Sequence, residues 1–498
     1  MPNSKVYLGI DVGASSGRVL AGLFDGARLK LEEVHRFDNG GVHVGDTMYW
    51  DVLRLWQSIV DGLRAAHVRY GDEVHSIGVD TWGVDFGLLG SDDRLLGNPV
   101  CYRDGRTVGI FDKAFDIVPR EEIFAETGLQ FMEFNTLYQL LGMKLQGSPL
   151  LDAAGSFLMI PDLINWMLTG EKANEMTNAT TTQFYNPQTG DWARALLEKF
   201  ELPTAMLGNI IPPGTRLGGL RGSVADATGL RGVSVVAPGT HDTASAVMAV
   251  PASATAGEQP DWCYISSGTW SLMGVEVARP IINDKCAELN FTNEGGIGGT
   301  TRVLKNIAGL WLVQECRRVW KESGRDYSWS ELVRLAQQAA PLESLIEPDH
   351  ADFVAPADMP QAIRDFCVRT GQPVPESEGA VIRAAMESLT LRYRMVLGWL
   401  EELMGSRIET IHIVGGGTQN RELNQMTADA TGRRVVAGPV EATAIGNVMM
   451  QAVSAGDVRD ISQAREVIRT SFDVEEFNPQ RTHAWDEALG RFERLLRG

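Results

Sequence analysis

Two short apolar runs on either side of a turn of small residues constrain the start of this chain most strongly. Residues 6–11 read VYLGID and residues 18–24 read RVLAGLF, and only valine, glycine, alanine and serine lie between them. Apolar runs of this length around a turn predict a β-hairpin with buried strands. The turn is either an ordinary polar hairpin turn or a loop in which a phosphate group approaches the backbone.

The residues that follow predict a three-stranded meander, then a helix and a fourth strand. Asp25-Gly26 is a strong hairpin signal, and residues 28–37 alternate as a third strand. Residues 74–86 return to a strand. Between them, residues 50–69 have helical spacing, and the expected apolar face consists of Leu53, Trp56, Ile59, Val60 and Leu63. The order βββαβ differs from the repeated βαβ units of a dinucleotide-binding fold.

The same shape returns in the C-terminal half of the chain. Residues 264–277 again read as strand, polar turn and strand. Before them, residues 249–262 are small and polar and contain proline, which is typical of a domain linker. Residues 100–200 are mostly helical with Pro and Gly breaks, and we interpret them as an insertion that caps a cleft. The repeated shape predicts an α/β protein of two related lobes with a central cleft.

The expected boundaries follow these patterns. We expect a first lobe over residues 1–248 with the insertion at about 100–200, a second lobe over residues 262–455, and a helical tail over residues 456–498. Residues 233–247 predict a strand, a glycine turn and a helix. In the second lobe we expect helices at 378–404, 419–431 and 441–455 and strands at 409–414 and 434–438.

Charge and cysteine usage exclude several classes of protein. The 498 residues carry a formal net charge of −19, which argues against nonspecific binding to nucleic acid. The cysteines have no CxxC spacing, which indicates reduced thiols in a cytoplasmic protein and neither a disulfide framework nor a zinc site. They are Cys101, Cys263, Cys286, Cys316 and Cys367. No apolar run approaches the roughly 20 residues of a membrane helix, and the N-terminus has no signal segment, so we expect a soluble protein.

The turn DVGASSGR, residues 11–18, is the first candidate site for chemistry. Backbone amides and hydroxyls here can donate to phosphate oxygens, and Gly13 and Gly17 give the backbone conformational freedom. Arg18 adds a fixed cation, and Asp11 can hold Mg²⁺ through water. A plain polar hairpin turn is an equally good explanation of these residues. No GxxxxGK[ST] sequence occurs, so the chain is not a P-loop protein.

The second candidate is APGTHDTAS, residues 237–245. Asp242 follows an apolar strand and a glycine turn, and a carboxylate at a strand end can accept the proton of a substrate hydroxyl during phosphoryl transfer. The amides at the start of the next helix can face phosphates. The alternative is that Asp242 is a helix N-cap and His241 a surface residue.

Three further motifs are weaker alone. SSGTWSLMG, residues 266–274, repeats the first hairpin, and Thr269 there can contact phosphates. IHIVGGGTQN, residues 411–420, ends a strand in three glycines that permit close approach of a ligand. GVDTWGVDF, residues 78–86, places an aromatic ring beside two carboxylates, which suits a sugar or polyol. Each has an ordinary alternative, a tight turn for the first two and a core tryptophan with surface acids for the third.

Taken together, these motifs resemble a known family. The order DVGASSGR, DTWGVDF, THDTAS, SSGTWSLMG and VGGGTQN is similar to that of the FGGY carbohydrate kinases in the actin-like ATPase superfamily. Further matching segments are NTLYQL at 135–140, TNATTTQ at 177–183, RVLKNIAGLWL at 302–312 and AGPVEATAIGN at 437–447. The resemblance covers nearly the whole chain and implies two ribonuclease-H-like lobes around a cleft.

The resemblance also implies a reaction and a set of site residues. It implies transfer of a phosphoryl group from ATP, with Mg²⁺, to the C1 hydroxyl of L-rhamnulose, by a monomer or small homo-oligomer. Asp242 matches the proton acceptor, and Asp11 is expected to hold the metal through water. The matching sugar contacts are Gly83, His241, Thr243 and Asn306. The matching ATP contacts are Ala14, Ser15, Ser16, Gly17, Arg18, Thr269, Gln314 and Gly416.

Three alternatives stay open at this point. A kinase for another ketose, such as L-fuculose or L-xylulose, would have the same fold and ATP site. An actin-like ATPase that polymerises or acts as a chaperone switch would have no use for Asp242 or for the sugar-like motif around Trp82. A sugar sensor without catalysis would not need Asp242 together with two phosphate hairpins.

Overall fold

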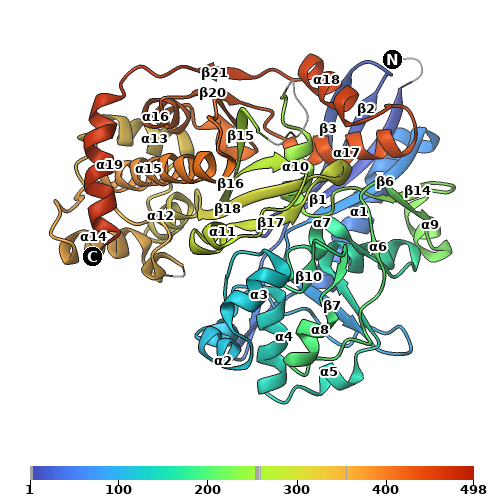
Figure 1. Ribbon diagram of the computed structural model, residues 1–498. Helices are drawn as coiled ribbons and strands as arrows, with labels where there is room; N and C mark the ends of the chain where they lie inside the picture. Colours follow the sequence, from blue (N-terminus) through green and yellow to red (C-terminus); the bar gives the residue numbers. More distant parts are fainter. Residues whose placement is uncertain (1–3, 253–256, 258, 355, 498) are drawn as a thin grey trace. The chain divides into compact units, whose positions relative to one another are not determined.

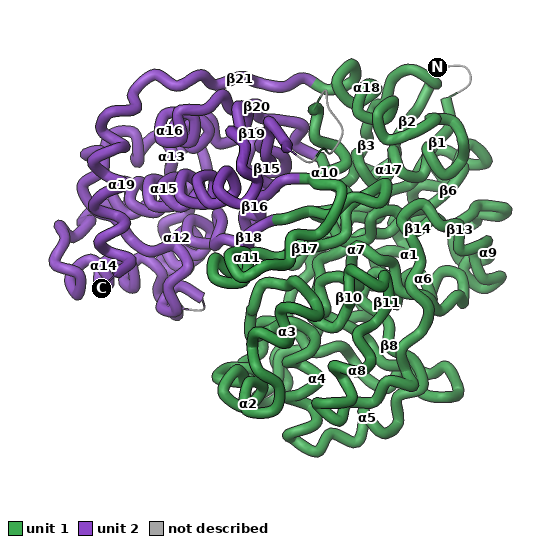
Figure 2. Tube along the Cα trace, viewed as in Figure 1, with its two compact units in different colours: residues 1–257, 276–303, 442–472 green, residues 258–275, 304–441, 473–498 purple. Residues whose placement is uncertain are grey.

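The computed structural model describes residues 4–252, 257, 259–354 and 356–497. Two compact units are distinguished by colour in Figure 2: unit 1 comprises residues 1–257, 276–303 and 442–472, and unit 2 comprises residues 258–275, 304–441 and 473–498. The segment expected to be a linker, 249–262, includes residues 253–256 and 258, which lie outside the described residues. The boundaries expected from the sequence stay predictions.

Unit 1 contains most of the elements labelled in Figure 1. Its strands are β1 (Lys5–Val12), β2 (Ser16–Phe24), β3 (Leu29–Asp38), β4 (Gly41–Val44), β5 (Thr47–Trp50), β6 (Val74–Thr81), β7 (Phe86–Leu89), β8 (Ser156–Met159), β9 (Asn174–Glu175), β10 (Tyr185–Asn186), β11 (Asp191–Trp192), β12 (Ile210–Ile211), β13 (Thr215–Gly219), β14 (Ser234–Ala237) and β17 (Thr292–Gly295). Its helices are α1 (Val52–Tyr70), α2 (Ile110–Ile117), α3 (Arg120–Thr127), α4 (Thr136–Leu145), α5 (Pro149–Ala153), α6 (Ile160–Thr169), α7 (Met176–Ala179), α8 (Arg194–Lys199), α9 (Gly222–Thr228), α10 (Asp242–Met248), α11 (Asp284–Glu288), α17 (Ala442–Ser454) and α18 (Ile461–Ser471).

Unit 2 contains the remaining elements. Its strands are β15 (Trp262–Ser267), β19 (Thr410–Val414), β20 (Arg434–Ala437) and β21 (Glu475–Phe477), and β16 (Trp270–Val277) and β18 (Thr301–Ala308) are divided between the units along the chain. Its helices are α12 (Trp311–Glu322), α13 (Trp329–Gln338), α14 (Met359–Arg369), α15 (Glu378–Met404), α16 (Arg421–Thr431) and α19 (His483–Leu495).

The main sheet of unit 1 confirms the βββαβ order, with an additional hairpin, β4–β5, before α1. Its strand order is β13-β14-β6-β1-β2-β3. Strand β1 is antiparallel to β2 and parallel to β6, so Asp11 lies beside Arg18 on one neighbouring strand and beside Asp80 on the other. The register therefore places two carboxylates and one guanidinium-bearing residue in a row across three strands.

Helix α1 covers one face of this sheet. Val6, Leu8 and Ile10 of β1 are fully buried in a core that also contains Leu55, Ile59, Leu63 and other α1 residues. The expected helix is confirmed, but its expected face is partly wrong. Leu53 is 60% exposed. The buried face runs through Leu55 instead, because α1 begins at residue 52 and its apolar stripe follows the sheet that it covers.

Helix α17 packs on the opposite face, where the sheet has glycines. A Cβ atom on Gly22 would lie 2.4 Å from a methyl carbon of Val448, and one on Gly78 would lie 2.4 Å from Oδ1 of Asn447. A Cβ on Gly446 of α17 would lie only 1.9 Å from the backbone oxygen of Ser245 in α10. Glycine at these positions therefore lets α17 approach both the sheet and α10 closely.

Residues 100–200 are mainly helical, as expected. Figure 1 shows α2, α3, α4, α5 and α8 gathered in one group within unit 1. Short two-stranded pairings, such as β10 with β11, join these helices. Among the described residues no helix is both long enough and apolar enough to cross a membrane.

The second sheet has the order β17-β18-β16-β15-β19-β20-β21. Strand β15 is antiparallel to β16, as the sequence predicts for 264–277, and parallel to β19. The long expected helix is confirmed as α15, which packs against α13 and α16. The C-terminal segment expected to be a helical tail contains two helices, and it also supplies β21, which pairs with β20 at the sheet edge.

Candidate functional site

The first hairpin turn is held by its neighbours in unit 1. The amide of Gly13 donates to the carbonyl of Ser16 at 2.9 Å, and Nδ2 of Asn39 donates to the carbonyl of Gly13 at 2.8 Å. Neither Gly13 nor Gly17 has a positive φ, so the expected need for glycine freedom in this turn is wrong. Instead, a Cβ on Gly17 would overlap the ring of Phe37 at 2.1 Å. The close packing of the Phe37 ring therefore explains why residue 17 is a glycine.

Asp11 and Arg18 form an ion pair. Nη2 of Arg18 lies 2.7 Å from Oδ2 of Asp11, and the two residues are paired directly across β1 and β2. Both side chains are largely buried. The strand register therefore places a positive charge against the carboxylate expected to hold the metal.

A second buried carboxylate, that of Asp80 on β6, lies beside Asp11 of β1. Its Oδ2 accepts a 2.6 Å hydrogen bond from Nδ2 of Asn447 on α17, and its Oδ1 has no hydrogen-bond partner among the residues that the structure describes. Burial raises the pKa of Asp80 well above the usual aspartate range, and the negative charge of Asp11 adds to this shift. The sequence motif at 78–86 indicated Asp80 as a residue of interest. Its link to Asn447, far along the chain, was not expected.

Asp242 is the first residue of α10, and the N-cap position is taken by His241. Oδ1 of Asp242 accepts hydrogen bonds from the amide of Thr243 at 2.6 Å and from its hydroxyl at 3.2 Å. Burial raises the pKa of Asp242, and the charge of Asp11 adds to the rise while His241 opposes it. Both structural alternatives are wrong, because Asp242 is not the N-cap and His241 is buried.

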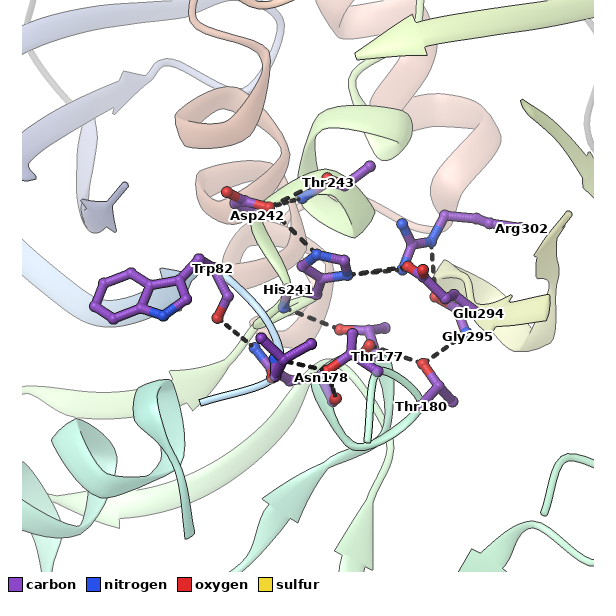
Figure 3. A network of polar contacts seen from close by, with 12 residues as sticks. Trp82, Thr177, Asn178, Thr180, His241, Asp242, Thr243, Glu294, Gly295 and Arg302 are labelled. Carbon is purple, nitrogen blue, oxygen red and sulfur yellow. Dashed lines mark hydrogen bonds and ion pairs between the residues drawn. The ribbon is translucent and has the colours of Figure 1, made fainter. Parts of the chain in front are cut away.

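The segment TNATTTQ, residues 177–183, is the scaffold behind this carboxylate (Figure 3). The hydroxyl of Thr177 accepts the backbone amide of His241 at 3.2 Å. The hydroxyl of Thr180 accepts the amide of Gly295 on β17 at 2.9 Å. One short segment therefore fixes both the start of α10 and strand β17.

The same segment contacts the loop around Gly83. Nδ2 of Asn178 donates to the carbonyl of Trp82 at 3.3 Å, and the amide of Val84 donates to Oγ1 of Thr181 at 3.0 Å. A Cβ on Gly83 would lie 2.9 Å from the side chain of Thr181. Val84 has φ 66°, a conformation that a β-branched residue rarely adopts. This strained, tightly bonded loop lies next to the scaffold of Asp242.

Asp85 has a structural environment that differs from the expected sugar pocket. Its Oδ2 accepts hydrogen bonds from the indoles of Trp50 and Trp82 at 2.6 and 3.0 Å and from the amide of Tyr102 at 3.1 Å. Its Oδ1 accepts Nε2 of Gln139 at 2.9 Å. Burial raises the pKa of this carboxyl, and these four donors lower it. Asp85 therefore accepts hydrogen bonds from four donors of the protein itself, and one of these donors is the indole of Trp82.

The expected nucleotide contacts of unit 2 lie around one hairpin turn between β15 and β16. The carbonyl of Thr269 in this turn accepts the amide of Trp311, which begins α12, at 3.0 Å. Gly417 lies against the end of β15, since a Cβ there would be 2.0 Å from Oγ of Ser267. A Cβ on Gly416 would meet no atom of the described residues within 4 Å. Gly416 therefore presents an open backbone face.

The other two expected contacts of unit 2 lie on elements next to this turn. Gln314 is in the first turn of α12, where its backbone amide donates to the carbonyl of Leu310 at 2.8 Å. The amide of Leu310 in turn donates to the carbonyl of Gly268 at 3.1 Å. Asn306 lies on β18. The structure thus groups Thr269, Gln314 and Gly416 through the β15–β16 turn.

Comparison with known proteins identifies the family. Residues 6–249 match the N-terminal domain, and residues 263–455 the C-terminal domain, of the FGGY family of carbohydrate kinases. This chain belongs to the FGGY carbohydrate kinases. Among its curated relatives are proteins named rhamnulokinase from Bacteroides thetaiotaomicron and Bacillus subtilis, at 45% and 39% identity. The alignments cover 99% and 95% of this chain and 99% and 96% of the relatives. The resemblance in the sequence motifs is confirmed.

Solved structures confirm the fold of this FGGY kinase. A ligand-bound xylulose kinase from Lactobacillus acidophilus matches with a TM-score of 0.79 at 16% identity, over 99% of this chain and 96% of that protein. Plasmodium falciparum glycerol kinase with ADP matches with a TM-score of 0.75 at 13% identity, over 99% and 97%. The predicted two-domain α/β class is correct.

Proposed function

We propose that this FGGY kinase transfers the terminal phosphoryl group of ATP to the C1 hydroxyl of L-rhamnulose, giving L-rhamnulose 1-phosphate. The observation that carries the proposal is the set of relatives named rhamnulokinase, which are 38–45% identical over nearly the whole chain. The arrangement around Asp242 in unit 1 supports a phosphoryl transfer to an alcohol.

Asp242 is assigned as the proton acceptor in this proposal. Its position at the start of α10 is fixed by Thr243 and by the backbone of His241, and its side chain keeps about a third of its surface accessible. As the sugar oxygen forms its bond to phosphorus, the hydroxyl proton passes to the carboxylate and the bond from phosphorus to ADP breaks. Burial raises the pKa of Asp242, which makes it a better acceptor than an ordinary aspartate.

The sugar contacts are assigned to Gly83, His241 and Thr243 in unit 1 and to Asn306 in unit 2. Val84, the residue after Gly83, and His241 both donate backbone hydrogen bonds to the 177–183 scaffold, which supports the common assignment of Gly83 and His241. The small size of Gly83 is needed because Thr181 lies within 2.9 Å of the position of a Cβ. A larger residue would displace the loop that follows it.

The nucleotide contacts are assigned to the two hairpin turns and to the residues around the second one. In unit 1 they are Ala14, Ser15, Ser16, Gly17 and Arg18, and in unit 2 they are Thr269, Gln314 and Gly416. The open backbone face of Gly416 supports its place in this set, because a ligand can approach there without a steric barrier. Arg18 is already paired with Asp11, so its interaction with phosphate competes with that ion pair.

Mg²⁺ is assigned to Asp11, through water. The described residues contain no group of three or more His, Cys, Asp and Glu side chains that could ligate an ion directly. The negative charge of Asp11 nevertheless adds to the raised pKa values of Asp80 and Asp242, for which burial is the largest cause, so these carboxylates repel one another electrostatically. A hydrated Mg²⁺ held by Asp11 would relieve that repulsion and would supply positive charge to the phosphates of ATP.

An ADP-release assay with L-rhamnulose and MgATP tests the proposed function. We expect sugar-dependent ADP release by the wild type and a loss of about a hundredfold to ten-thousandfold in kcat for Asp242→Asn. Asp112→Asn, at an exposed position on α2, is the control and should keep normal turnover. Near-normal turnover by Asp242→Asn would show that another group is the base.

A panel of ketoses tests the substrate assignment separately. L-Rhamnulose should have the highest kcat/KM, with L-fuculose and L-xylulose well below it. A higher kcat/KM with either of those sugars would leave the assignment as a sugar kinase in place and would overturn the assignment of L-rhamnulose as its substrate. ADP release that does not depend on any sugar would support the actin-like ATPase alternative instead.

A further inference from the structure

The backbone just before the proposed base, Asp242, is bonded to one buried carboxylate, that of Glu175. Glu175 is the last residue of β9 and is fully buried. Its Oε2 accepts the backbone amide of Thr240 at 2.9 Å and the hydroxyl of Thr240 at 2.8 Å. Thr240 comes two residues before Asp242. The sequence did not indicate Glu175 as a candidate site residue.

A second connection leads from Glu175 through Thr177 to the residue next to the base. The hydroxyl of Thr177 donates to Oε2 of Glu175. The same hydroxyl accepts the backbone amide of His241 at 3.2 Å (Figure 3). A threonine hydroxyl has one proton and two lone pairs, so it can make both bonds at once. Glu175 therefore fixes Thr240 directly and the backbone of His241 through one hydroxyl.

The bonded segment lies at the end of β6 and leads directly into α10. The amide of Thr81, the last residue of β6, donates to the carbonyl of Thr240 at 2.9 Å. Thr81 and His241 also form a parallel β-bridge. The next residue, Asp242, is the first residue of α10. The main chain is therefore fixed in place immediately before the helix that carries the proposed base.

The side chain of His241 has contacts that are separate from those of its backbone. Nη2 of Arg302 donates to Nδ1 of the ring at 3.2 Å, and Oε2 of Glu294 lies 3.2 Å from the same nitrogen. Glu294 lies on β17 and Arg302 on β18, and both are buried. These ring contacts do not involve Glu175, so a change at Glu175 acts on the main chain of this segment.

Glu175 lies next to a second buried carboxyl, that of Asp162 on α6. The amide of Glu175 donates to Oδ1 of Asp162 at 3.2 Å, and Oδ2 of Asp162 has no partner among the residues that the structure describes. Burial raises the pKa of both carboxyls. Four hydrogen bonds from Thr177 and Thr240 oppose the rise at Glu175, whereas the charge of Glu175 adds to the rise at Asp162. Of the two carboxyls, Glu175 is therefore the one whose surroundings favour the charge.

We propose that Glu175 is a positioning residue for phosphoryl transfer, which holds the main chain of Thr240 and His241 so that Asp242 meets the sugar hydroxyl. The inference rests on the proposed function in one respect, namely that Asp242 is the proton acceptor. As the sugar oxygen bonds to phosphorus, its O–H bond breaks, the proton passes to Asp242, and the bond from phosphorus to ADP breaks. The base must lie within hydrogen-bond reach of that proton. A displacement of about 1 Å can lower the rate about a hundredfold.

Capping of α7 is the competing explanation, because Glu175 is the N-cap residue of this short helix. A cap needs one acceptor, and Oε1 provides it by accepting the amide of Thr177 at 3.0 Å. The other oxygen, Oε2, accepts its hydrogen bonds from Thr240 and from the hydroxyl of Thr177. A neutral residue can also cap a helix, and a buried carboxylate is costly. Capping alone therefore does not explain the bonds of Oε2.

The hydroxyl of Thr177 offers a test that keeps the shape of the core. Thr177→Val removes the hydroxyl, and Thr177→Ser keeps it. We expect Thr177→Val to lower kcat about tenfold or more, by more than it changes KM, and Thr177→Ser to keep kcat within about threefold. A packing role predicts the reverse order, because serine lacks a methyl group that valine has. Near-normal kcat in Thr177→Val, or an equal loss of kcat in both variants, would overturn the proposal.

Thr228→Val is the matched control for Thr177→Val. Thr228 is a buried residue of α9, and its hydroxyl donates to the carbonyl of Val224 at 2.8 Å and accepts the amide of Leu230 at 3.3 Å. Both substitutions therefore leave one buried backbone amide without its acceptor, and we expect both to lower the melting temperature. Thr228→Val should keep kcat within about twofold, since its bonds do not lead to the base. A loss of kcat as large as that of Thr177→Val would show that kcat follows stability and would overturn the proposal.

Glu175→Gln tests the carboxylate itself. Each oxygen of Glu175 accepts a backbone amide, so the NH2 group of glutamine would face an N–H donor in either orientation. We expect kcat to fall about tenfold or more and the amides of Thr240 and His241 to exchange hydrogen faster, as measured by mass spectrometry on the sugar-free protein. Glu387→Gln is the control, because Glu387 is also buried and accepts the amide of Leu342 at 2.7 Å. It should leave both measurements unchanged, and a Glu175→Gln variant that does the same would contradict the proposal.

Failure of this inference and failure of the proposed function are distinguishable. Hydrogen exchange is measured without sugar and does not depend on which sugar is phosphorylated. If Glu175→Gln fails to fold, the Thr177 variants decide the question. Absence of sugar-dependent ADP release in the wild type would overturn the proposed function. A wild type that phosphorylates L-rhamnulose, together with a Thr177→Val variant of normal kcat, would overturn the inference alone.

Discussion

Gly17 shows how a residue can be indicated by the sequence for the wrong reason. Its place in a small-residue turn suggested backbone freedom, yet its φ is not in the left-handed region. The constraint comes from Phe37, whose ring lies 2.1 Å from the position of a Cβ. Phe37 is paired with Gly17 across β2 and β3, so the required space is a property of the pair. No pattern within residues 11–18 contains that information.

A double-mutant cycle tests this pairing. Gly17→Ala should lower the free energy of unfolding by about 1–3 kcal/mol, because the new methyl group collides with the ring. Phe37→Ala removes the ring and is destabilising for a different reason, the loss of buried apolar surface. In the double variant the two costs should sum to less than their separate values, as measured by urea unfolding. Additive costs would mean that Phe37 does not limit residue 17.

Glu387 provides a pH-dependent prediction at the residue scale. Burial raises its pKa from 4.5 to about 7, against the lowering effect of Arg383, whose Nε lies 2.8 Å away. A carboxyl whose folded pKa is raised contributes stability below the unfolded pKa and loses it as the pH rises through the folded value. Between pH 4.5 and about 7 the contribution of Glu387 to the free energy of unfolding therefore falls by about 3 kcal/mol. Glu387→Gln should remove that slope.

Urea unfolding at a series of pH values, without nucleotide or Mg²⁺, measures the effect. Glu343→Gln, at an exposed position of the same unit, is the matched control and should keep the wild-type slope. A Glu387→Gln profile parallel to that of the wild type would show that Glu387 is ionised throughout this range.

At the element scale, the crossing of α10 and α17 links Asp242, the proposed base, to the sheet. Gly446 of α17 lies against the backbone of Ser245, and Asn447, the next residue, donates to Asp80. The crossing therefore places Asp242, at the start of α10, and Asp80 in one electrostatic cluster. The segment AGPVEATAIGN at 437–447 helped to indicate the family. In the structure, Gly446 of this segment allows the close approach of α17 to α10, and Asn447 donates the hydrogen bond to Asp80.

Two glycine substitutions separate close packing from helix propensity. Gly446→Ala should destabilise unit 1 strongly, by about 3 kcal/mol or more, because its Cβ would lie 1.9 Å from a backbone oxygen that cannot rotate away. Gly398 lies within α15, and a Cβ there would meet no described atom within 4 Å, so Gly398→Ala should stabilise the protein by about 0.5–1 kcal/mol. Thermal unfolding measures both, and a Gly446→Ala variant as stable as the wild type would contradict the close crossing.

At the scale of the whole molecule, buried thiols are present in both units. Cys101 and Cys286 belong to unit 1 and Cys263, Cys316 and Cys367 to unit 2, and every one is free and buried. Burial raises the pKa of Cys101 to about 12 and that of Cys367 to about 11. Thiolate chemistry at these sites therefore needs the surrounding core to open, and the reduced thiols expected from the sequence agree with this.

Thiol labelling should follow the unfolding of each core. We expect the native protein to react with fewer than one of its five thiols in the time that the protein in concentrated guanidinium chloride reacts with all of them. Mass spectrometry after brief labelling near the transition identifies which thiols open first. Equal labelling of native and denatured protein would contradict the burial of these cysteines.

The sequence indicated some of the candidate site residues and gave no signal for others. Asp242 and the glycines at 415–417 stand at strand ends in motifs whose order is specific, so the sequence indicates them as candidate site residues. Leu53 was placed on the wrong face, because the apolar stripe of a helix is defined by the sheet it covers. Glu294 and Arg302 were not indicated by the sequence, since a single charged residue within a strand gives no periodic signal. Both contact His241, which lies more than fifty residues earlier.

The sequence by itself determined the family, the order of the elements and the residues that stand at strand ends, because these depend on local apolar spacing and on motifs a few residues long. Only the tertiary structure decided which side chains share a charge environment. The charges of Asp11 and Asp242 add to the rise that burial causes in the pKa of Asp80, because a parallel register and a helix crossing bring the three residues together. Glu294 and Arg302 face His241 for the same reason, since burial and distance set electrostatic coupling and neither can be read along the chain.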